Sequence, residues 1–179
     1  TPTTLLLDKP MDGFSEVLYD LGSAIRRDGS EAFSTLYMQL ALAANPQSDV
    51  ALLERASLNE AMDKPQAAID SYLQVSATSP FRRGAELQAG LVLADVDRKA
   101  EAIATLTGLI QKQPDDRRAY LALGGVHASA KDFKSAADVY DKAVAAIGTP
   151  GQNDWTLFYQ RGIAHERTKD WPNAEQSFR

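Results

Sequence analysis

The sequence predicts an all-α protein, an α-solenoid in which antiparallel helix-turn-helix units follow one another in a right-handed superhelix. Three observations lead to this fold class. Prolines recur every 34 residues, small residues recur at the same interval, and the segments between them carry apolar residues at three- and four-residue spacing. No alternating segment rich in Val and Ile indicates a β-strand.

The first two helices are expected at residues 14–27 and 30–44, where apolar residues follow helical spacing. Asp28 and Gly29 between them have the chemistry of a turn. Equivalent turns follow one and two periods later, at Asp63-Lys64-Pro65 and at Asp97-Arg98. The chain is therefore expected to consist of helices joined by short turns.

Four series of residues keep the 34-residue period in phase. A proline, which cannot continue a helix, closes three successive units. The series are Pro46, Pro80 and Pro114; Gly22, Ala56, Gly90 and Gly124; Ser34, Ala68, Ala102 and Ala136; and Met38, Tyr72, Leu106 and Tyr140. After Gly148 the phase slips by four residues and resumes at Gly162, Ala174 and Phe178.

This pattern resembles the tetratricopeptide repeat (TPR) family, whose 34-residue unit has small eighth and twentieth residues, a bulky twenty-fourth and a proline at the thirty-second place. The resemblance covers residues 15–179 and follows a lead-in segment, residues 1–14. It implies repeats at 15–48, 49–82, 83–116 and 117–150 and a truncated repeat at 155–179. Departures from the pattern are Ala56 at the eighth place, Asn59, His127 and His165 at the eleventh, and Gly148 in place of a fourth proline.

Gly124 and Gly125 could belong either to a phosphate-binding loop or to a close contact between helices. A phosphate loop needs a preceding strand and a G-x-x-x-x-G-K-[ST] or G-x-G-x-x-G spacing, and the sequence has neither. We therefore expect Gly124, like Gly90, to be buried between the two helices of its repeat. Gly125 holds the ninth place, which the family packing turns toward the concave groove.

Composition and motifs argue against several functions. A net charge of −5 argues against nucleic acid as a partner, and no apolar run approaches the roughly 18 residues of a membrane span. The chain has no cysteine, no nucleophile elbow and no H-E-x-x-H spacing. We expect no catalytic residue, no metal site and no cofactor. His127 and His165 are expected to be partly buried core residues, and Trp155 and Trp171 to pack at helix starts.

The resemblance implies a concave groove, lined by the second, fifth, ninth and twelfth residues of each first helix, that holds a peptide or helix of a partner. The candidate partner-binding residues are Tyr19, Arg26, Leu53, Leu87, Leu91, Arg118, Leu121, Gly125, Tyr159 and Ile163. Most of these side chains are apolar, and exposed apolar surface marks interaction sites. The groove could instead be narrow, or filled by flanking segments of the chain itself.

The leading function is therefore a non-enzymatic scaffold for protein–protein interaction. The alternative is a structural spacer or oligomerisation array of a larger protein, with any catalytic domain outside this sequence. We also expect a longer loop with two turns at 148–154, Asp154 as the cap of the following helix, and self-association through the array ends, including Leu5 to Leu7. The Ala-rich repeats resemble bacterial multi-repeat proteins, which favours the cell envelope (periplasm) and leaves the cytoplasm open.

Overall fold

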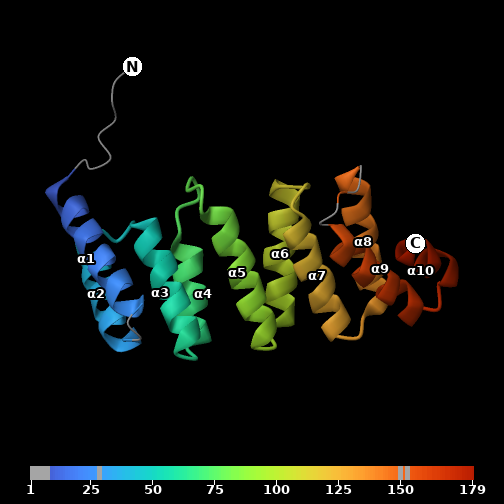
Figure 1. The fold of residues 1–179 in the computed structure, drawn as a ribbon, viewed down its shortest axis with the longest axis horizontal. Helices are drawn as coiled ribbons and strands as arrows, with labels where there is room; N and C mark the ends of the chain where they lie inside the picture. The colour runs from blue at the N-terminus through green and yellow to red at the C-terminus, as the bar shows by residue number, and fades with distance from the viewer. Residues whose placement is uncertain (1–8, 28–29, 149–150, 152–153) are drawn as a thin grey trace, which may run out of the picture. The chain divides into compact units, whose positions relative to one another are not determined.

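The computed structural model describes residues 9–27, 30–148, 151 and 154–179. Within these ranges the chain forms ten α-helices and no strand, so the predicted all-α class is confirmed (Figure 1). None of the helices in the described ranges is both long and apolar enough to span a bilayer.

The helices alternate as first and second members of successive pairs, which we number as repeats 1 to 5. They are α1 (Pro10–Arg27) and α2 (Glu31–Ala44), α3 (Asp49–Ala61) and α4 (Pro65–Gln74), α5 (Arg82–Asp95) and α6 (Lys99–Lys112), α7 (Arg117–Ser129) and α8 (Phe133–Ile147), and α9 (Trp155–Arg167) and α10 (Trp171–Phe178). The first helix begins at Pro10, four residues before the expected start at residue 14. Proline suits the first turn of a helix because that turn leaves its N–H groups without intrahelical partners.

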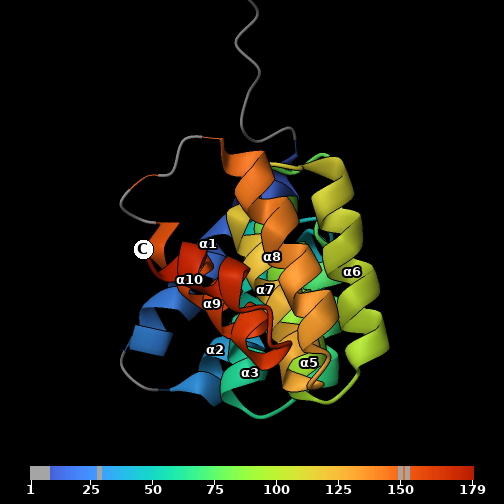
Figure 2. The same cartoon turned by 90° about the vertical axis from the view of Figure 1, so that its right-hand side faces the viewer.

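The chain divides into two compact units, the N-terminal unit Thr1–Ala89 and the C-terminal unit Gly90–Arg179. In the N-terminal unit, α2 packs against both α1 and α3, and α3 packs against α4. In the C-terminal unit, each helix from α6 to α10 packs on the next, and α9 also contacts α7 (Figure 2). The last repeat therefore stays stacked on repeat 4, as we predicted despite the phase slip.

The eighth place of the repeat is where the two helices of a pair come closest. A Cβ atom added to Gly90 would lie 2.7 Å from a methyl carbon of Leu106, and one added to Gly124 would overlap the ring of Tyr140. Both glycines are buried. The predicted close contacts at Gly90 and Gly124 are thus confirmed, and the partner in each is the bulky twenty-fourth residue. A side chain at these places would overpack the contact.

The turn between the helices of a pair has one recurring backbone feature. The fifteenth residue of four repeats has a positive φ, although none of the four is a glycine. These residues are Asp63 (54°), Asp97 (62°), Lys131 (62°) and Lys169 (62°). The sequence located the first two turns from their Asp residues, and the lysines complete the series. Left-handed backbone in a lysine costs free energy that a glycine would not.

Asp154 lies directly before α9, where we expected it to cap that helix. Its side chain makes no capping hydrogen bond to α9. Instead its Oδ2 accepts a hydrogen bond from the Gly151 N–H (2.7 Å), and its Oδ1 lies 2.8 Å from an Arg117 guanidinium nitrogen. The predicted cap is therefore wrong, because the buried carboxylate turns back to neutralise Arg117. The two turns predicted in this loop involve residues 149–150 and 152–153, which lie outside the described residues.

Candidate functional site

The first-helix face, made by the second, fifth, ninth and twelfth residues of the first helices, carries the predicted partner-binding residues. In the N-terminal unit these are Tyr19, Arg26, Leu53 and Leu87. Tyr19 and Leu53 are half-buried, whereas Leu87 is only 6% exposed and contributes mainly to packing. Arg26 reaches from α1 to α3, where it donates hydrogen bonds to Glu54 (2.8 Å) and Ser57 (2.9 Å). The side chain of Arg26 is therefore held within the chain.

A second polar contact lies next to this ion pair. The hydroxyl of Tyr72 on α4 donates a 2.5 Å hydrogen bond to the Glu60 carboxylate on α3. Burial raises the pKa of Tyr72 above its usual range, and the bond to Glu60 adds to that effect. Sequence reasoning missed the partnership because residues 60 and 72 lie on different helices of one pair.

In the C-terminal unit, the predicted residues are Leu91 on α5, Arg118, Leu121 and Gly125 on α7, and Tyr159 and Ile163 on α9. The last five share one side of their helices because they are spaced by three and four residues. We call these five residues the C-terminal strip. Gly125 is exposed, and no heavy atom lies within 4 Å of where its Cβ would be. Half of Tyr159 is exposed, and its ring meets Phe178 edge-on with centroids 6.2 Å apart.

Arg118 gives the strip a positive end. Its side chain is 65% exposed, and its nearest described carboxylate is Asp116 at 3.8 Å. The oxygen of Asp116 also accepts a hydrogen bond from the backbone N–H of Arg118, at 3.1 Å. Most of the Arg118 guanidinium therefore remains available to another molecule.

A partly buried polar cluster joins α8, α9 and α10. Asp141 accepts hydrogen bonds from the Arg161 Nε (2.6 Å), and it lies 3.1 Å from His165 Nε2. The other ring nitrogen of His165 lies 3.2 Å from Asp170. The hydrogen bonds from Asn173 hold the pKa of Asp170 below its usual range. Among the described residues, no group of three or more His, Cys, Asp or Glu side chains is arranged so that it could hold a metal ion.

One part of this cluster recurs in repeat 2. The seventh residue is an arginine and the twenty-third a serine in both repeats. Arg55 donates to Ser71 (3.0 Å), and Arg161 donates to Ser177 (2.7 Å). Each serine in turn donates to the backbone carbonyl four residues earlier, at 2.7 Å. Within repeat 2, and again within repeat 5, the same series of hydrogen bonds joins the first helix to the second.

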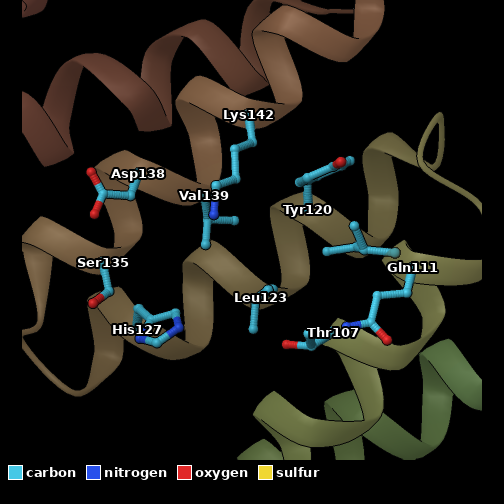
Figure 3. Close-up of a pocket in the computed structure, with 10 residues that line it drawn as sticks. Thr107, Gln111, Tyr120, Leu123, His127, Ser135, Asp138, Val139 and Lys142 are labelled. Atoms are coloured by element: carbon cyan, nitrogen blue, oxygen red, sulfur yellow. The ribbon is translucent and has the colours of Figure 1, made fainter.

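Repeat 4 has a pocket at the equivalent place. The pocket has a volume of about 440 Å³ and is lined by Thr107, Ile110, Gln111, Tyr120, Leu123, His127, Ser135, Asp138, Val139 and Lys142 (Figure 3). Leu123 replaces the arginine and Val139 the serine. At 3.6 residues per turn, Leu123 lies on the opposite side of α7 from Leu121 and Gly125. The pocket is thus separate from the C-terminal strip, and we did not predict it.

The two tryptophans are exposed rather than packed, against our expectation. Trp155 is 67% exposed and Trp171 is 61% exposed. Both stand at the first position of a helix, where the neighbouring repeat does not cover them. A helix start can therefore hold an aromatic residue without burying it.

The family of the chain follows from the repeats and from comparison with known proteins. Residues 87–153 match a family model described as a tetratricopeptide repeat. Within these residues the chain therefore carries tetratricopeptide repeats. Comparison with the curated proteins finds no match.

Solved structures share the TPR fold over nearly the whole chain. The crystal structure of MamA is 21% identical, covers 92% of this chain and 87% of its own, and has a TM-score of 0.74. The pilF protein of Pseudomonas aeruginosa is 19% identical over 95% of this chain and 76% of its own, with a TM-score of 0.70. A TPR protein of Parabacteroides merdae is 17% identical over 95% of this chain and 64% of its own, with a TM-score of 0.69. At these identities the likeness establishes the α-solenoid fold.

Proposed function

We propose that this TPR protein is a non-enzymatic scaffold that binds a peptide or helix of a partner protein on its first-helix face. The observation that carries the proposal is the C-terminal strip, in which open space beside Gly125 adjoins apolar residues of the same helical side. TPR arrays generally serve as protein-interaction scaffolds, and apolar surface beside an exposed cation suits a peptide ligand.

The two units offer different surfaces to such a partner. In the N-terminal unit, Arg26 is bound by Glu54 and Ser57, so the predicted polar anchor is already engaged. In the C-terminal unit, Arg118 remains largely exposed beside the strip. We therefore place the main contact on the C-terminal strip, with Tyr19, Leu53, Leu87 and Leu91 contributing less.

The chemistry of the strip specifies the partner segment. Leu121, Tyr159 and Ile163 would contact apolar side chains, and Arg118 would pair with a carboxylate. Since Gly125 leaves room for one bulky group, an aromatic or leucine side chain of the partner would lie over it. The expected ligand is an amphipathic peptide with a large apolar residue and a nearby Asp or Glu.

A selection from a random peptide library tests this proposal without knowledge of the natural partner. Peptides selected on the wild-type protein should lose binding to Gly125→Trp, because the added ring fills the open space, and to Leu121→Glu. The control is Ala145→Trp, which adds the same side chain at an exposed place on α8. Selected peptides that bind Gly125→Trp as tightly as the wild type would place the binding site elsewhere.

A second candidate, self-association with another copy of the chain, is favoured by one observation on repeat 1. Four large apolar side chains there are exposed: Leu21 (46%), Phe33 (61%), Leu36 (48%) and Leu40 (46%). The equivalent places of repeat 2 hold Arg55, Ala67, Asp70 and Gln74, which line a depression shared with α2. Because burying one such side chain gains about 1.5–3 kcal/mol, the surface favours association.

Light scattering over a concentration series tests self-association. The double variant Phe33→Glu, Leu36→Glu should remain monomeric at concentrations where the wild type forms dimers. A wild-type protein that stays monomeric throughout would rule out this role. The leucines Leu5 to Leu7, predicted to take part, lie outside the described residues.

A further inference from the structure

The pocket of repeat 4 takes no part in the proposed function, and repeats 2 and 5 show a polar arrangement at the equivalent place. In repeat 2, Arg55 extends over this site, donating from Nε to Ser71 Oγ and from Nη2 to Gln74 Oε1, both at 3.0 Å. In repeat 5, Arg161 donates to Ser177 and to Asp141. In both repeats the site therefore holds a guanidinium, surrounded by oxygen acceptors.

Repeat 4 replaces each of the three residues that define this arrangement. Leu123 replaces the arginine at the seventh place, and Val139 replaces the serine acceptor at the twenty-third place. Lys142 replaces the glutamine, Gln74 in repeat 2, at the twenty-sixth place. The serine and glutamine acceptors are lost and Lys142 brings a cation to the rim, whereas the carboxylate of Asp70 is kept as Asp138. The charge that the site favours is thus reversed, from a positive to a negative group.

The side chains around the pocket form an apolar floor with a polar rim. Ile110, Tyr120, Leu123 and Val139 supply the floor, and Tyr120 and Leu123 are themselves buried. Figure 3 shows the ammonium end of Lys142 turned toward Val139, with Thr107 and Gln111 of α6 on the other side of the pocket. The carboxylate of Asp138 turns away from the floor in the same view.

Lys142 is the group with unused bonding capacity. Among the described residues, no carboxylate pairs with its ammonium, although Asp138 precedes it by one helical turn. His127, by contrast, lies 3.4 Å from Asp132 and is engaged through Nδ1. A ligand carboxylate would give Lys142 the charge-assisted hydrogen bond it lacks.

We propose that this pocket binds a ligand with an apolar body and one carboxylate, the body resting on Leu123 and Val139 and the carboxylate meeting Lys142. A volume of about 440 Å³ falls within the range of small-molecule sites, about 300–1,000 Å³. Thr107 and Gln111 can donate further hydrogen bonds from α6. A free aryl or alkyl carboxylate and the C-terminal residue of a peptide share this chemistry.

An NMR titration of the isotope-labelled protein tests the proposal with three probes. They are 4-phenylbutyrate, its neutral amide, and the peptide acetyl-Gly-Gly-Phe with a free carboxylate. The two carboxylate probes should shift the backbone N–H signals of residues 107–111, 120–127 and 135–142. They should also bind more tightly than the neutral amide of 4-phenylbutyrate. A higher affinity of the peptide would identify the source as a peptide end, and the reverse would identify a small molecule.

Two charge variants isolate the contribution of Lys142. Lys142→Gln should weaken carboxylate binding about fivefold, the scale of a partly exposed ion pair, and leave binding of the amide unchanged. Lys134→Gln removes an equal charge from the same helix outside the pocket and should change neither. Equal affinities of acid and amide, or an undiminished affinity in Lys142→Gln, would overturn the proposal.

A filled pocket gives an independent test. Leu123→Arg with Val139→Ser recreates the arginine–serine pair of repeat 2 and should abolish binding of both carboxylates. Circular dichroism establishes whether this double variant folds, and if it does not, the Lys142 and Lys134 variants decide the question. Signal shifts confined to Leu121, Gly125 and Tyr159 would assign the ligand to the C-terminal strip and refute the pocket.

Discussion

Repeats 2 and 4 have the same helical frame but differ on the surface that lies between successive second helices. In repeat 2 this surface is polar, with Arg55 bound to Ser71 and Gln74 in a depression of about 320 Å³. In repeat 4 it is an apolar-floored pocket of about 440 Å³. A helix pair of this array therefore keeps its fold while its seventh, twenty-third and twenty-sixth residues change chemistry.

The largest expected difference concerns the seventh residue itself. Leu123→Ala should lower the free energy of unfolding by about 2–5 kcal/mol, because it removes buried methyl groups from the pocket floor. Arg55→Ala should cost less, about 0.5–1.5 kcal/mol for each hydrogen bond that it breaks, since Arg55 is only partly buried. Urea unfolding of both variants measures the two losses. A greater loss for Arg55→Ala would make the polar pair, rather than the apolar floor, the more important contact.

The next largest difference between repeats 2 and 4 concerns the eighth residue of the repeat. Repeat 2 has Ala56, fully buried, where repeat 4 has Gly124 against the Tyr140 ring. Gly124→Ala should destabilise the protein, because overpacking costs about 1–3 kcal/mol and the gain in helix propensity is about 1 kcal/mol. Gly124→Leu should lower the Tm further.

Gly125→Ala is the matched control for this substitution. Its added methyl group meets open space, so only the gain in helix propensity remains and the Tm should rise. Differential scanning calorimetry measures all three variants. A stabilised Gly124→Ala would mean that Tyr140 moves aside easily and that the helices of repeat 4 are no closer than those of repeat 2.

The frame of this fold could be predicted from sequence because it depends on residue types that recur in phase. Gly124 and Tyr140 stand 16 residues apart in one repeat, as Gly90 and Leu106 do in another, so the period alone indicated which residues meet. Stacking of repeat 5 followed from the same period. The helix start at Pro10 was missed because nothing in the repeat pattern extends to the residues before the first unit.

The surface chemistry could be predicted only in part. Helical register indicated which residues lie on the first-helix face, but not that Arg26 would reach Glu54 on another helix. Asp154 has the residue type of a helix cap, yet its carboxylate pairs with Arg117 of α7 instead of accepting a hydrogen bond from the first turn of α9. The pocket of repeat 4 depends on α6, α7 and α8 together. The seventh residues of the repeats, Leu21, Arg55, Ala89, Leu123 and Arg161, set repeats 2 and 5 apart but do not by themselves indicate a pocket in repeat 4.

The turns give a smaller contrast between the two repeats. Lys131 in repeat 4 and Asp63 in repeat 2 both have a positive φ. Lys131→Gly should stabilise the protein by about 1 kcal/mol, since left-handed backbone costs about 1–2 kcal/mol in a residue with a Cβ and glycine loses more entropy on folding. Asp63→Gly should gain less, because aspartate tolerates this conformation better. Thermal unfolding measures both variants, and an equal gain would show that the residue type at this turn is immaterial.

The smallest contrast lies at the start of the second helix, and it depends on pH. Asp132 caps α8 by accepting a hydrogen bond from the Ser135 N–H (3.2 Å), whereas Lys64 at the start of α4 makes no capping hydrogen bond. Hydrogen bonding from Ser135 holds the pKa of Asp132 below its usual range of about 3.9. The carboxylate therefore stabilises the fold fully above that unfolded-state value, and its contribution is lost as the pH falls through the lower folded-state pKa. Asp132→Asn keeps a good cap without a titrating group, so its unfolding free energy should fall less than that of the wild type between about pH 5 and pH 2.

Lys64→Ser should give repeat 2 the cap it lacks, with a gain of about 0.5–1 kcal/mol that is the same at both ends of this pH range, because a hydroxyl does not titrate there. Urea midpoints at several pH values measure these effects, and an acid dependence in Asp132→Asn equal to that of the wild type would show that the cap of repeat 4 does not depend on its charge.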